Sequence, residues 1–372
     1  MNNYKFSAPC LFGIESVLGD ELKRMEAKNV TVHNGRVDFE GDDDMLARAN
    51  ICSRYAERIL IKMGEFRATT FTELFDGVNK LPWEDFIGKL EAFPVKGWSI
   101  DSALHSIPDC QSIIKKAIVK RLSAKYKIDW FEESGAIVPI RFTILKDTVT
   151  VNIDTSGDGL HKRGYRRNSN DAPLKETLAA AMCDLARIYP DTKIYDPFCG
   201  SGTILIEAAL KATNIAPGLR RYFAAERFQV CNPESFKRER TRAQDLVRHN
   251  IDFEAFGFDI DKNAVELTLA NAKKAGVEKY VKALVRDVKD FTLPEGRTLV
   301  ITNPPYGERL LDVRAAEELY KTMGNVFERQ EGKKFYVISP HDEFEKIFGR
   351  PADKRRKLYN GMIKCQYFMY FK

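Results

Sequence analysis

Residues 194–207 read Ile194-Tyr-Asp-Pro-Phe-Cys-Gly-Ser-Gly-Thr-Ile-Leu-Ile-Glu207, and this stretch decides the fold that we expect. An apolar run ends in an acid, passes through a turn with two glycines, and enters residues whose apolar positions recur at helical spacing. Small residues let a ligand lie against the backbone of such a turn, and the N–H groups of the new helix face it. The stretch therefore predicts a ligand-binding loop between a strand and a helix.

A second stretch, Thr302-Asn-Pro-Pro-Tyr-Gly307, follows the apolar run Thr298–Ile301 about a hundred residues further along the chain. Two consecutive prolines cannot continue a central strand, so we expect the strand to stop at Asn303. In an open parallel sheet, ligands bind at the edge formed by the carboxyl ends of the strands. Asn303 is therefore predicted to lie at the ligand edge.

Three classes of ligand compete for the glycine turn. A phosphate-binding P-loop needs a lysine after its last glycine, and none follows Gly202. A dinucleotide needs a third glycine where Leu205 stands. S-adenosylmethionine fits better, because it offers a carboxylate to backbone donors, ribose hydroxyls to an acid after the second strand, and an adenine amine to an acid after the third. The residues predicted to hold it are Asp196, Gly200, Gly202, Asp259 and Asp287.

The N-terminal half has a different pattern. Residues 1–66 follow the order β-α-β-β-α-β of the ferredoxin-like plan, with Asn34-Gly35 as a hairpin signal. Residues 67–160 contain an amphipathic helix after Ile107, whose outward side carries lysines. Those lysines can be a solvated helix face or a nucleic-acid contact. The ones considered for RNA are Lys115, Lys116 and Lys120.

A basic strip lies at the expected boundary between two domains and reads Leu160-His-Lys-Arg-Gly-Tyr-Arg-Arg-Asn168. It contains four cations, a tyrosine and no acid, a composition that suits phosphates and a stacked base. The four are Lys162, Arg163, Arg166 and Arg167. Residues 212–254 interrupt the later alternation of strand and helix, and we interpret them as an insertion on the ligand side of the sheet or as a solvated helical excursion.

Composition limits the class of protein. The formal net charge of the 372-residue chain is only +6, so attraction to nucleic acid must come from local clusters. The seven cysteines form no Cys-x-x-Cys pair, which argues against a disulfide framework and against a zinc cluster. The chain shows neither the apolar core of a signal peptide nor a run long enough to span a bilayer. We therefore expect a soluble cytoplasmic protein without a metal or a membrane partner.

Asp196-Pro-Phe-Cys-Gly-Ser-Gly202 together with Asn303-Pro-Pro-Tyr306 resembles the class I methyltransferases that modify exocyclic amines. The wider set, which includes Leu160-His-Lys-Arg-Gly-Tyr-Arg and Pro217-Gly-Leu-Arg-Arg221, resembles the THUMP-domain RNA guanine-N2 methyltransferases, especially the bacterial enzymes acting on 23S rRNA. The resemblance implies an α/β fold: a Rossmann-like methyltransferase domain at 161–372 with a seven-stranded, mostly parallel sheet. An α+β region precedes it, made of a ferredoxin-like domain at 1–66 and a THUMP RNA-binding domain at 67–160.

The resemblance also implies a substrate and roles for three residues. The partner would be structured RNA, with rRNA favoured and no DNA expected. The Asn303 side-chain oxygen and the Pro304 carbonyl would accept the two hydrogens of a base amine, while Tyr306 would stack on the extruded base. The motif alone does not decide whether the methylated atom is adenine N6 or guanine N2, or whether the substrate is tRNA or rRNA. The same motif also occurs in enzymes that methylate adenine in DNA or glutamine in proteins. A non-catalytic RNA-binding ribosome assembly factor is the alternative outside the enzymes.

Overall fold

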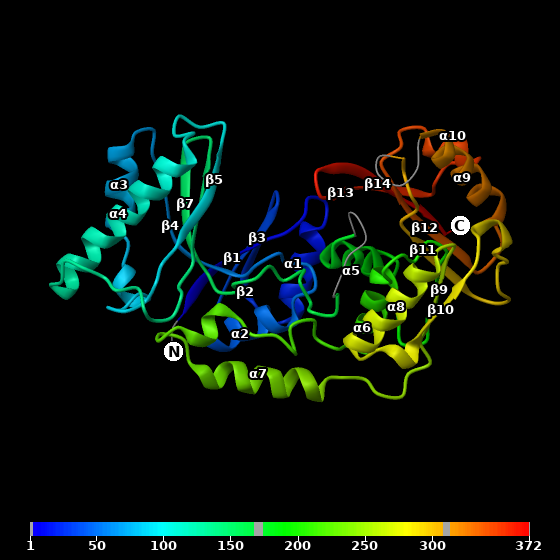
Figure 1. Cartoon of the computed structure of the whole chain (residues 1–372), viewed down its shortest axis with the longest axis horizontal. Coiled ribbons are helices and arrows are strands. Elements are labelled where there is room, and N and C mark those ends of the chain that lie inside the picture. The colour runs from blue at the N-terminus through cyan, green and yellow to red at the C-terminus, as the bar shows by residue number, and fades with distance from the viewer. Residues whose placement is uncertain (1–2, 167–173, 308–312, 372) are drawn as a thin grey trace. The chain divides into compact units, whose positions relative to one another are not determined.

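The computed structural model describes residues 3–166, 174–307 and 313–371 (Figure 1). The chain packs into two compact units. The first comprises residues 1–10, 19–160 and 221–242, and the second comprises residues 11–18, 161–220 and 243–372. Each unit is therefore assembled from segments that are separate in the sequence.

The first unit begins with the predicted ferredoxin-like arrangement. Its strands β1 to β4 lie in the order β2-β3-β1-β4. Gly35, with a φ of 74°, makes the turn between β2 and β3. The elements are β1 (Tyr4–Pro9), α1 (Glu15–Arg24), β2 (Lys28–His33), β3 (Arg36–Gly41), α2 (Asp43–Cys52) and β4 (Leu60–Arg67).

The same sheet continues from β4 into the second half of this unit, in the order β4-β7-β6-β5. The chain adds α3 (Phe71–Asn79), β5 (Val95–Ile100), α4 (Ile107–Tyr126), β6 (Ile140–Leu145) and β7 (Thr148–Asp154). Helices α3 and α4 lie on one side of these strands (Figure 1). Helix α4 buries Ile114, Ala117, Ile118 and Leu122, as its amphipathic pattern predicts.

The second unit is an α/β layer structure. Its sheet has the order β10-β9-β8-β11-β12-β14-β13, in which every neighbouring pair from β10 to β12 is parallel and β14 is antiparallel to its neighbours. The strands are β8 (Lys193–Asp196), β9 (Glu254–Asp259), β10 (Val281–Val285), β11 (Thr298–Thr302), β12 (Lys333–Ser339), β13 (Lys354–Asn360) and β14 (Ile363–Tyr370). The predicted seven-stranded, mostly parallel sheet is confirmed. The direction of strand order reverses between β8 and β11, where ligands bind in such sheets.

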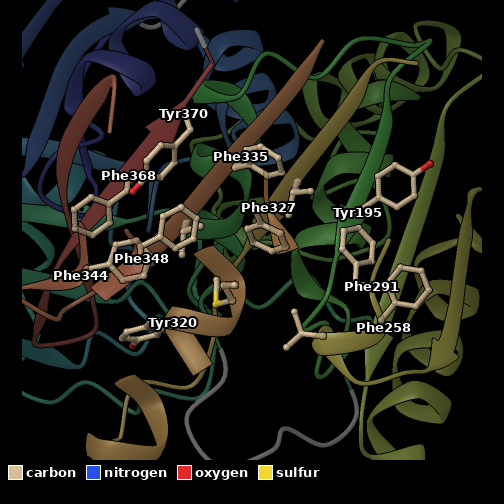
Figure 2. Packing of buried hydrophobic residues seen from close by; sticks show 14 of the residues in the cluster. Tyr195, Phe258, Phe291, Tyr320, Phe327, Phe335, Phe344, Phe348, Phe368 and Tyr370 are labelled. Carbon is tan, nitrogen blue, oxygen red and sulfur yellow. The ribbon is translucent and has the colours of Figure 1, made fainter. Parts of the chain in front are cut away.

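Helices support this sheet. Helices α5 (Glu176–Leu185), α6 (Thr203–Ala212) and α8 (Lys262–Ala275) pack in sequence, α5 on α6 and α6 on α8. Helices α9 (Val313–Val326) and α10 (Phe344–Phe348) bring side chains into an aromatic cluster with the strands (Figure 2). Within it the rings of Phe344 and Phe368 stack with centroids 4.5 Å apart. Buried rings of this size fix the strands whose ends form the ligand edge.

The charge-dense part of residues 212–254 packs with the first unit. It forms helix α7 (Pro233–Asp245), and residues 221–242 cluster with the N-terminal sheet. Arg240 donates to both oxygens of Glu226 at 2.8 and 2.9 Å, and Arg48 donates to both oxygens of Glu239 at 2.8 and 2.9 Å. The segment is thus a helical part of the first unit that is held by ion pairs, and neither sequence interpretation included these pairs.

Within the three described stretches, none of the helices has both the length and the apolar character needed to cross a membrane.

Candidate active site

Two loops start side by side at the carboxyl edge of the second sheet. Strands β8 and β11 are parallel neighbours, paired at Ile194 with Leu299 and at Tyr195 with Val300. Neighbouring strands are about 4.8 Å apart, so the glycine turn after β8 and the Asn303 loop after β11 begin together. Thr302 Oγ1 donates to Asp196 Oδ1 at 2.6 Å and ties the two strand ends directly. This threonine was not among the predicted site residues, although it immediately precedes Asn303.

The two glycines of the turn are required for different reasons. Gly200 and Gly202 have φ angles of 52° and 78°, a left-handed region that side chains rarely adopt. A Cβ on Gly202 would come within 2.7 Å of Thr268, whereas a Cβ on Gly200 would meet no described atom within 4 Å. Gly202 is therefore needed for packing, while Gly200 borders open space in which a ligand can lie against the backbone.

Asp196 is buried at the end of β8, with 1% of its surface exposed. Its Oδ1 accepts hydrogen bonds from the Thr302 hydroxyl and from the Phe198 N–H at 3.1 Å. Burial raises the pKa of the Asp196 carboxyl to about 7, against the lowering effect of these two hydrogen bonds. A cationic group beside this carboxyl would favour its charged form. The site is therefore suited to the ammonium group of an amino-acid-like donor.

Asp259 is the last residue of β9, and Asp287 follows β10 at the same edge. Asp259 accepts the Gly200 N–H on Oδ2 and the Asp261 N–H on Oδ1, both at 3.0 Å, so it braces the glycine turn. Asp287 accepts the Lys289 N–H at 3.0 Å and pairs with its ammonium at 3.2 Å. These contacts, led by the backbone hydrogen bond, lower the pKa of Asp287. Each carboxylate oxygen has a second lone pair, so both acids can still accept from ligand hydroxyl or amine groups.

Ile260 is a residue of this edge that the sequence interpretation did not include. It lies between Asp259 and Asp261, and 73% of its surface is exposed. A large apolar side chain at a ligand edge can pack against the face of a flat ring. The apolar surface that is exposed without the ligand is then buried, and this burial favours binding. The sequence could have indicated Ile260 as a site residue, because it directly follows the acid at the end of a strand.

Asn303 has an unusual environment. Its Oδ1 is buried and has no hydrogen-bond partner among the described residues. An unsatisfied buried acceptor costs about 1–3 kcal/mol, so such a group usually awaits a ligand or has a functional role. Pro304 beside it is buried, and Tyr306 is half-buried with its hydroxyl accepting from Asn360 Nδ2 at 2.6 Å. The arrangement can accept a hydrogen from an amine next to the glycine turn.

Comparison with known protein families gives three matches. Residues 163–368 match a domain described as an RMKL-like methyltransferase domain. The chain belongs to this methyltransferase family. Residues 5–60 match an RlmL ferredoxin-like domain and residues 68–154 match a THUMP domain. The predicted family is thereby confirmed as a THUMP-containing methyltransferase family.

Individual relatives cover the whole chain. This methyltransferase is 41% identical to "Putative RNA methyltransferase YpsC" of Bacillus subtilis, over 100% of this chain and 97% of that protein. It is 33% identical to "Ribosomal RNA large subunit methyltransferase K/L" of Psychromonas ingrahamii, over 96% of this chain and 49% of that longer protein.

One solved structure, "SMU.472, a putative methyltransferase complexed with SAH", shares 40% identity over 100% of this chain and 98% of its own, with a TM-score of 0.94. SAH is the product that remains when S-adenosylmethionine loses its methyl group. S-adenosylmethionine as the cofactor is thereby confirmed at the level of the family.

The cations predicted to bind RNA fall into two groups. Lys116 and Lys120 are exposed on α4, and Lys162 is exposed in the basic strip. Lys115 is partly buried: it pairs with Glu133, and its Nζ lies 3.7 Å from the centre of the Phe93 ring. Arg167 lies outside the described residues of the methyltransferase.

Arg163 and Arg166 require a correction, because both point into the methyltransferase unit. The Arg163 side chain is 2% exposed and its Nε lies 3.4 Å from Glu207 Oε1, which also accepts from the Tyr165 hydroxyl at 3.0 Å. Arg166 donates to the Thr203 hydroxyl at 3.0 Å and to the Leu174 carbonyl at 2.9 Å. These guanidinium groups hold the strip against α6, and neither side chain is presented to an RNA phosphate in this structure.

Proposed function

We propose that this methyltransferase transfers the methyl group of S-adenosylmethionine to the exocyclic N2 of a guanine in 23S rRNA. The observation that carries the proposal is the buried Oδ1 of Asn303 beside the glycine turn, which has no hydrogen-bond partner within residues 3–166, 174–307 and 313–371. An amine is the complementary donor, and the donor molecule supplies an electrophilic methyl group at that turn. RNA as the substrate is supported by the THUMP match at residues 68–154 and by the names of the two relatives.

The chemistry follows from the weak nucleophilicity of the base amine, whose lone pair is delocalised into the ring. Asn303 Oδ1 and the Pro304 carbonyl each accept one amine hydrogen, so the nitrogen can pyramidalise and direct its lone pair at the methyl group. As the new C–N bond forms, the C–S bond breaks, and its electron pair stays on the sulfur of S-adenosylhomocysteine, which leaves as a neutral thioether. The methylated amine then releases one proton to water. Tyr306 stacks on the base and holds its plane. The protein contributes placement and fixed dipoles, which can supply roughly 7–11 kcal/mol in favourable cases.

We also propose the division of labour that the sequence predicts. Residues 161–372 carry the reaction, residues 67–160 bind structured RNA, and residues 1–66 connect to the THUMP region through β4. Exposed Lys116, Lys120 and Lys162 would contact phosphates. The protein would act in the cytoplasm, where ribosomal RNA is modified in bacteria. The rRNA assignment is supported by the K/L relative, of which the chain spans about half.

The test uses RNA from cells that lack the gene. Purified protein and S-adenosylmethionine with a labelled methyl group are incubated with that RNA, which is then separated into 23S, 16S and tRNA and digested to nucleosides. The proposal expects labelled N2-methylguanosine in the 23S fraction, and no label in RNA from cells that carry the gene. Label found in tRNA, or found as N6-methyladenosine, would overturn the proposed substrate. It would still agree with an RNA methyltransferase.

Two variants separate an enzyme from a non-catalytic assembly factor. Asn303→Ala is expected to lose at least about a hundredfold in kcat while keeping its affinity for the donor within a few-fold. Asn303→Asp retains an acceptor oxygen and should keep more activity than the alanine variant. Full activity in Asn303→Ala, or donor binding without methylation by the unaltered protein, would reject the roles assigned above.

A further inference from the structure

The hairpin of β13 and β14 ends beside the candidate catalytic loop. The two strands pair from Lys354 opposite Met369 to Asn360 opposite Ile363, with Gly361 in the turn at a φ of 65°. At that turn, Asn360 Nδ2 donates to the Tyr306 hydroxyl at 2.6 Å. The end of the hairpin is therefore fixed to the residue proposed to stack on the target base.

This hairpin is strongly basic. Residues 354–370 contain five Lys and Arg and no Asp or Glu. Two of the five have partners that anchor the strand: Arg355 pairs with Glu345 at 3.2 Å, and Arg356 donates to the Gly13 carbonyl at 2.7 Å. Lys357 and Lys364 are exposed nearer the turn.

The exposed cations share one face with an aromatic ring. Tyr359 pairs directly with Lys364, and Lys357 lies two positions earlier on the same strand, so all three side chains project from the same side of the sheet. The Lys357 ammonium lies 5.3 Å from the centre of the Tyr359 ring. Met362, in the turn, is 97% exposed. Cations beside an aromatic and an apolar side chain form a surface suited to a single strand of nucleic acid.

We propose that this hairpin is an RNA-contact element of the active site: Asn360 positions Tyr306, while Lys357 and Lys364 bind phosphates flanking the target nucleotide. The inference rests on the proposed function, since the occupant is the RNA strand that delivers the base. An extruded base stays attached to its neighbours, so the flanking phosphates must pass close to the loop that holds it. The competing explanation is that lysines on an edge strand only prevent pairing with another sheet.

The first test measures binding of a 23S rRNA transcript to the full chain in the presence of S-adenosylhomocysteine, between 50 and 200 mM salt. The double variant Lys357→Ala with Lys364→Ala is expected to weaken binding severalfold and to reduce the slope of log K against log salt by about 1.5, since each phosphate contact contributes about 0.7–0.9. The matched control is Lys273→Ala with Lys274→Ala. These lysines are exposed in the last turn of α8, which packs on β9 and on β10, the edge strand opposite β13.

If the hairpin double variant behaves like the control while the unaltered protein methylates RNA, the hairpin proposal is overturned and the proposed function stands. If the unaltered protein neither binds nor methylates RNA, both fall together. The substituted lysines are exposed, so the unfolding temperature should match that of the unaltered protein and a folding defect would be visible there.

The second test asks whether Asn360 acts through Tyr306. Tyr306→Phe keeps the ring and removes only the hydroxyl that Asn360 contacts. Each single variant, Asn360→Ala or Tyr306→Phe, is expected to lower kcat about threefold to tenfold with the KM for the donor unchanged, because the ring is less well placed. The double variant should lose no more than the larger single loss. Losses that multiply in the double variant would show that Asn360 does not position Tyr306.

Discussion

Burial and cation binding have opposite effects on the charge of Asp196. It is nearly inaccessible to solvent, yet it stands where a cationic part of the donor would be held, and burial raises its pKa to about 7. The folded protein without the donor thus binds a proton at this carboxyl more tightly than the unfolded chain does. Binding of a cation would reverse that preference.

The first prediction concerns stability against pH. Because the folded pKa of Asp196 lies above the ordinary value of 3.8, its protonation stabilises the fold at low pH, and this contribution is lost as pH rises toward about 7. Asp196→Asn removes the dependence. Relative to the unaltered protein, the variant should gain on the order of 1–4 kcal/mol of unfolding free energy between pH 5 and pH 8. Denaturant unfolding without the donor at both pH values measures the difference.

Asp287→Asn is the control for this prediction. Hydrogen bonding to Lys289 lowers the pKa of Asp287, so its contribution is present above the ordinary value and is lost only in more acidic solution. It should therefore show no relative change between pH 5 and pH 8. Parallel pH profiles for Asp196→Asn and the unaltered protein would contradict the proposed protonation of Asp196.

The second prediction separates the two glycines of the turn. Gly202→Ala combines a left-handed backbone with a Cβ placed 2.7 Å from Thr268, so it should lower the unfolding free energy by about 2 kcal/mol or more. Gly200→Ala has the left-handed penalty of about 1 kcal/mol without a clash, and its methyl group enters the open space beside the turn. We expect it to weaken donor binding at least tenfold, as measured by calorimetry. Similar effects of the two variants on stability and on binding would refute this distinction.

Arg163 shows where prediction from single residues stops. Four cations without an acid indicated a surface strip, but the acid that pairs with Arg163 is Glu207, 44 positions later on α6. Charge in a local window cannot reveal a partner that only the fold supplies. The strand ends at Asp196 and Thr302 and the positive φ of Gly200, in contrast, were predictable because strand ends, φ requirements and proline placement are local properties.

Secondary structure elements were predicted best where the signal was local. Asn34-Gly35, the predicted hairpin signal, forms the turn between β2 and β3, where Gly35 has a positive φ angle. The seven-stranded, mostly parallel sheet followed from the family resemblance rather than from periodicity. The sequence did not assign helix α7 to the first unit, because its acids and bases pair with Asp44 and Arg48, nearly two hundred residues away.

The third prediction is made for helix α4. Lys116 and Lys120 are exposed one turn apart on the same side of the helix. If they contact RNA phosphates, substituting both by alanine should weaken binding of a 23S rRNA transcript severalfold and lower the salt slope by about 1.5. Filter binding at several salt concentrations gives both quantities. Affinity for the donor should not change.

Lys125 provides the comparison on the same helix. It is also exposed, but it lies half a turn of the helical wheel away from Lys116. Lys125→Ala is therefore expected to leave the salt slope within about 0.3 of the original value. Equal effects of Lys116→Ala and Lys125→Ala would indicate diffuse attraction by net charge instead of a defined face.

The two compact units of the chain do not correspond to two consecutive stretches of the sequence. Residues 221–242 leave the methyltransferase unit to join the first unit, where Ala225 N donates to the Thr155 carbonyl at 3.0 Å. Phe223 and Phe236 stack and are buried. A cut between residues 160 and 161, which the order of the sequence motifs suggests, therefore separates this segment from its partners.

The last prediction concerns two fragments of the methyltransferase unit. One is residues 161–372, and the other replaces residues 221–242 in that fragment by a short Gly-Ser linker. In the first fragment, α7 loses Arg48 as a partner and the two phenylalanines lose packing worth about 1.5–3 kcal/mol each. The segment should unfold locally, expose apolar surface and be cut rapidly by trypsin within Lys237–Arg242.

The linker fragment decides whether the segment belongs energetically to the first unit. It lacks the exposed phenylalanines, so it should stay soluble at concentrations where the first fragment aggregates, and bind an apolar dye less. Donor affinity should be similar in both fragments, since Asp196, Asp259 and Asn303 lie outside residues 221–242. If trypsin cuts α7 no faster in the first fragment than in the full chain, the segment is held by the methyltransferase unit, and the division of the chain at residues 221 and 242 is wrong.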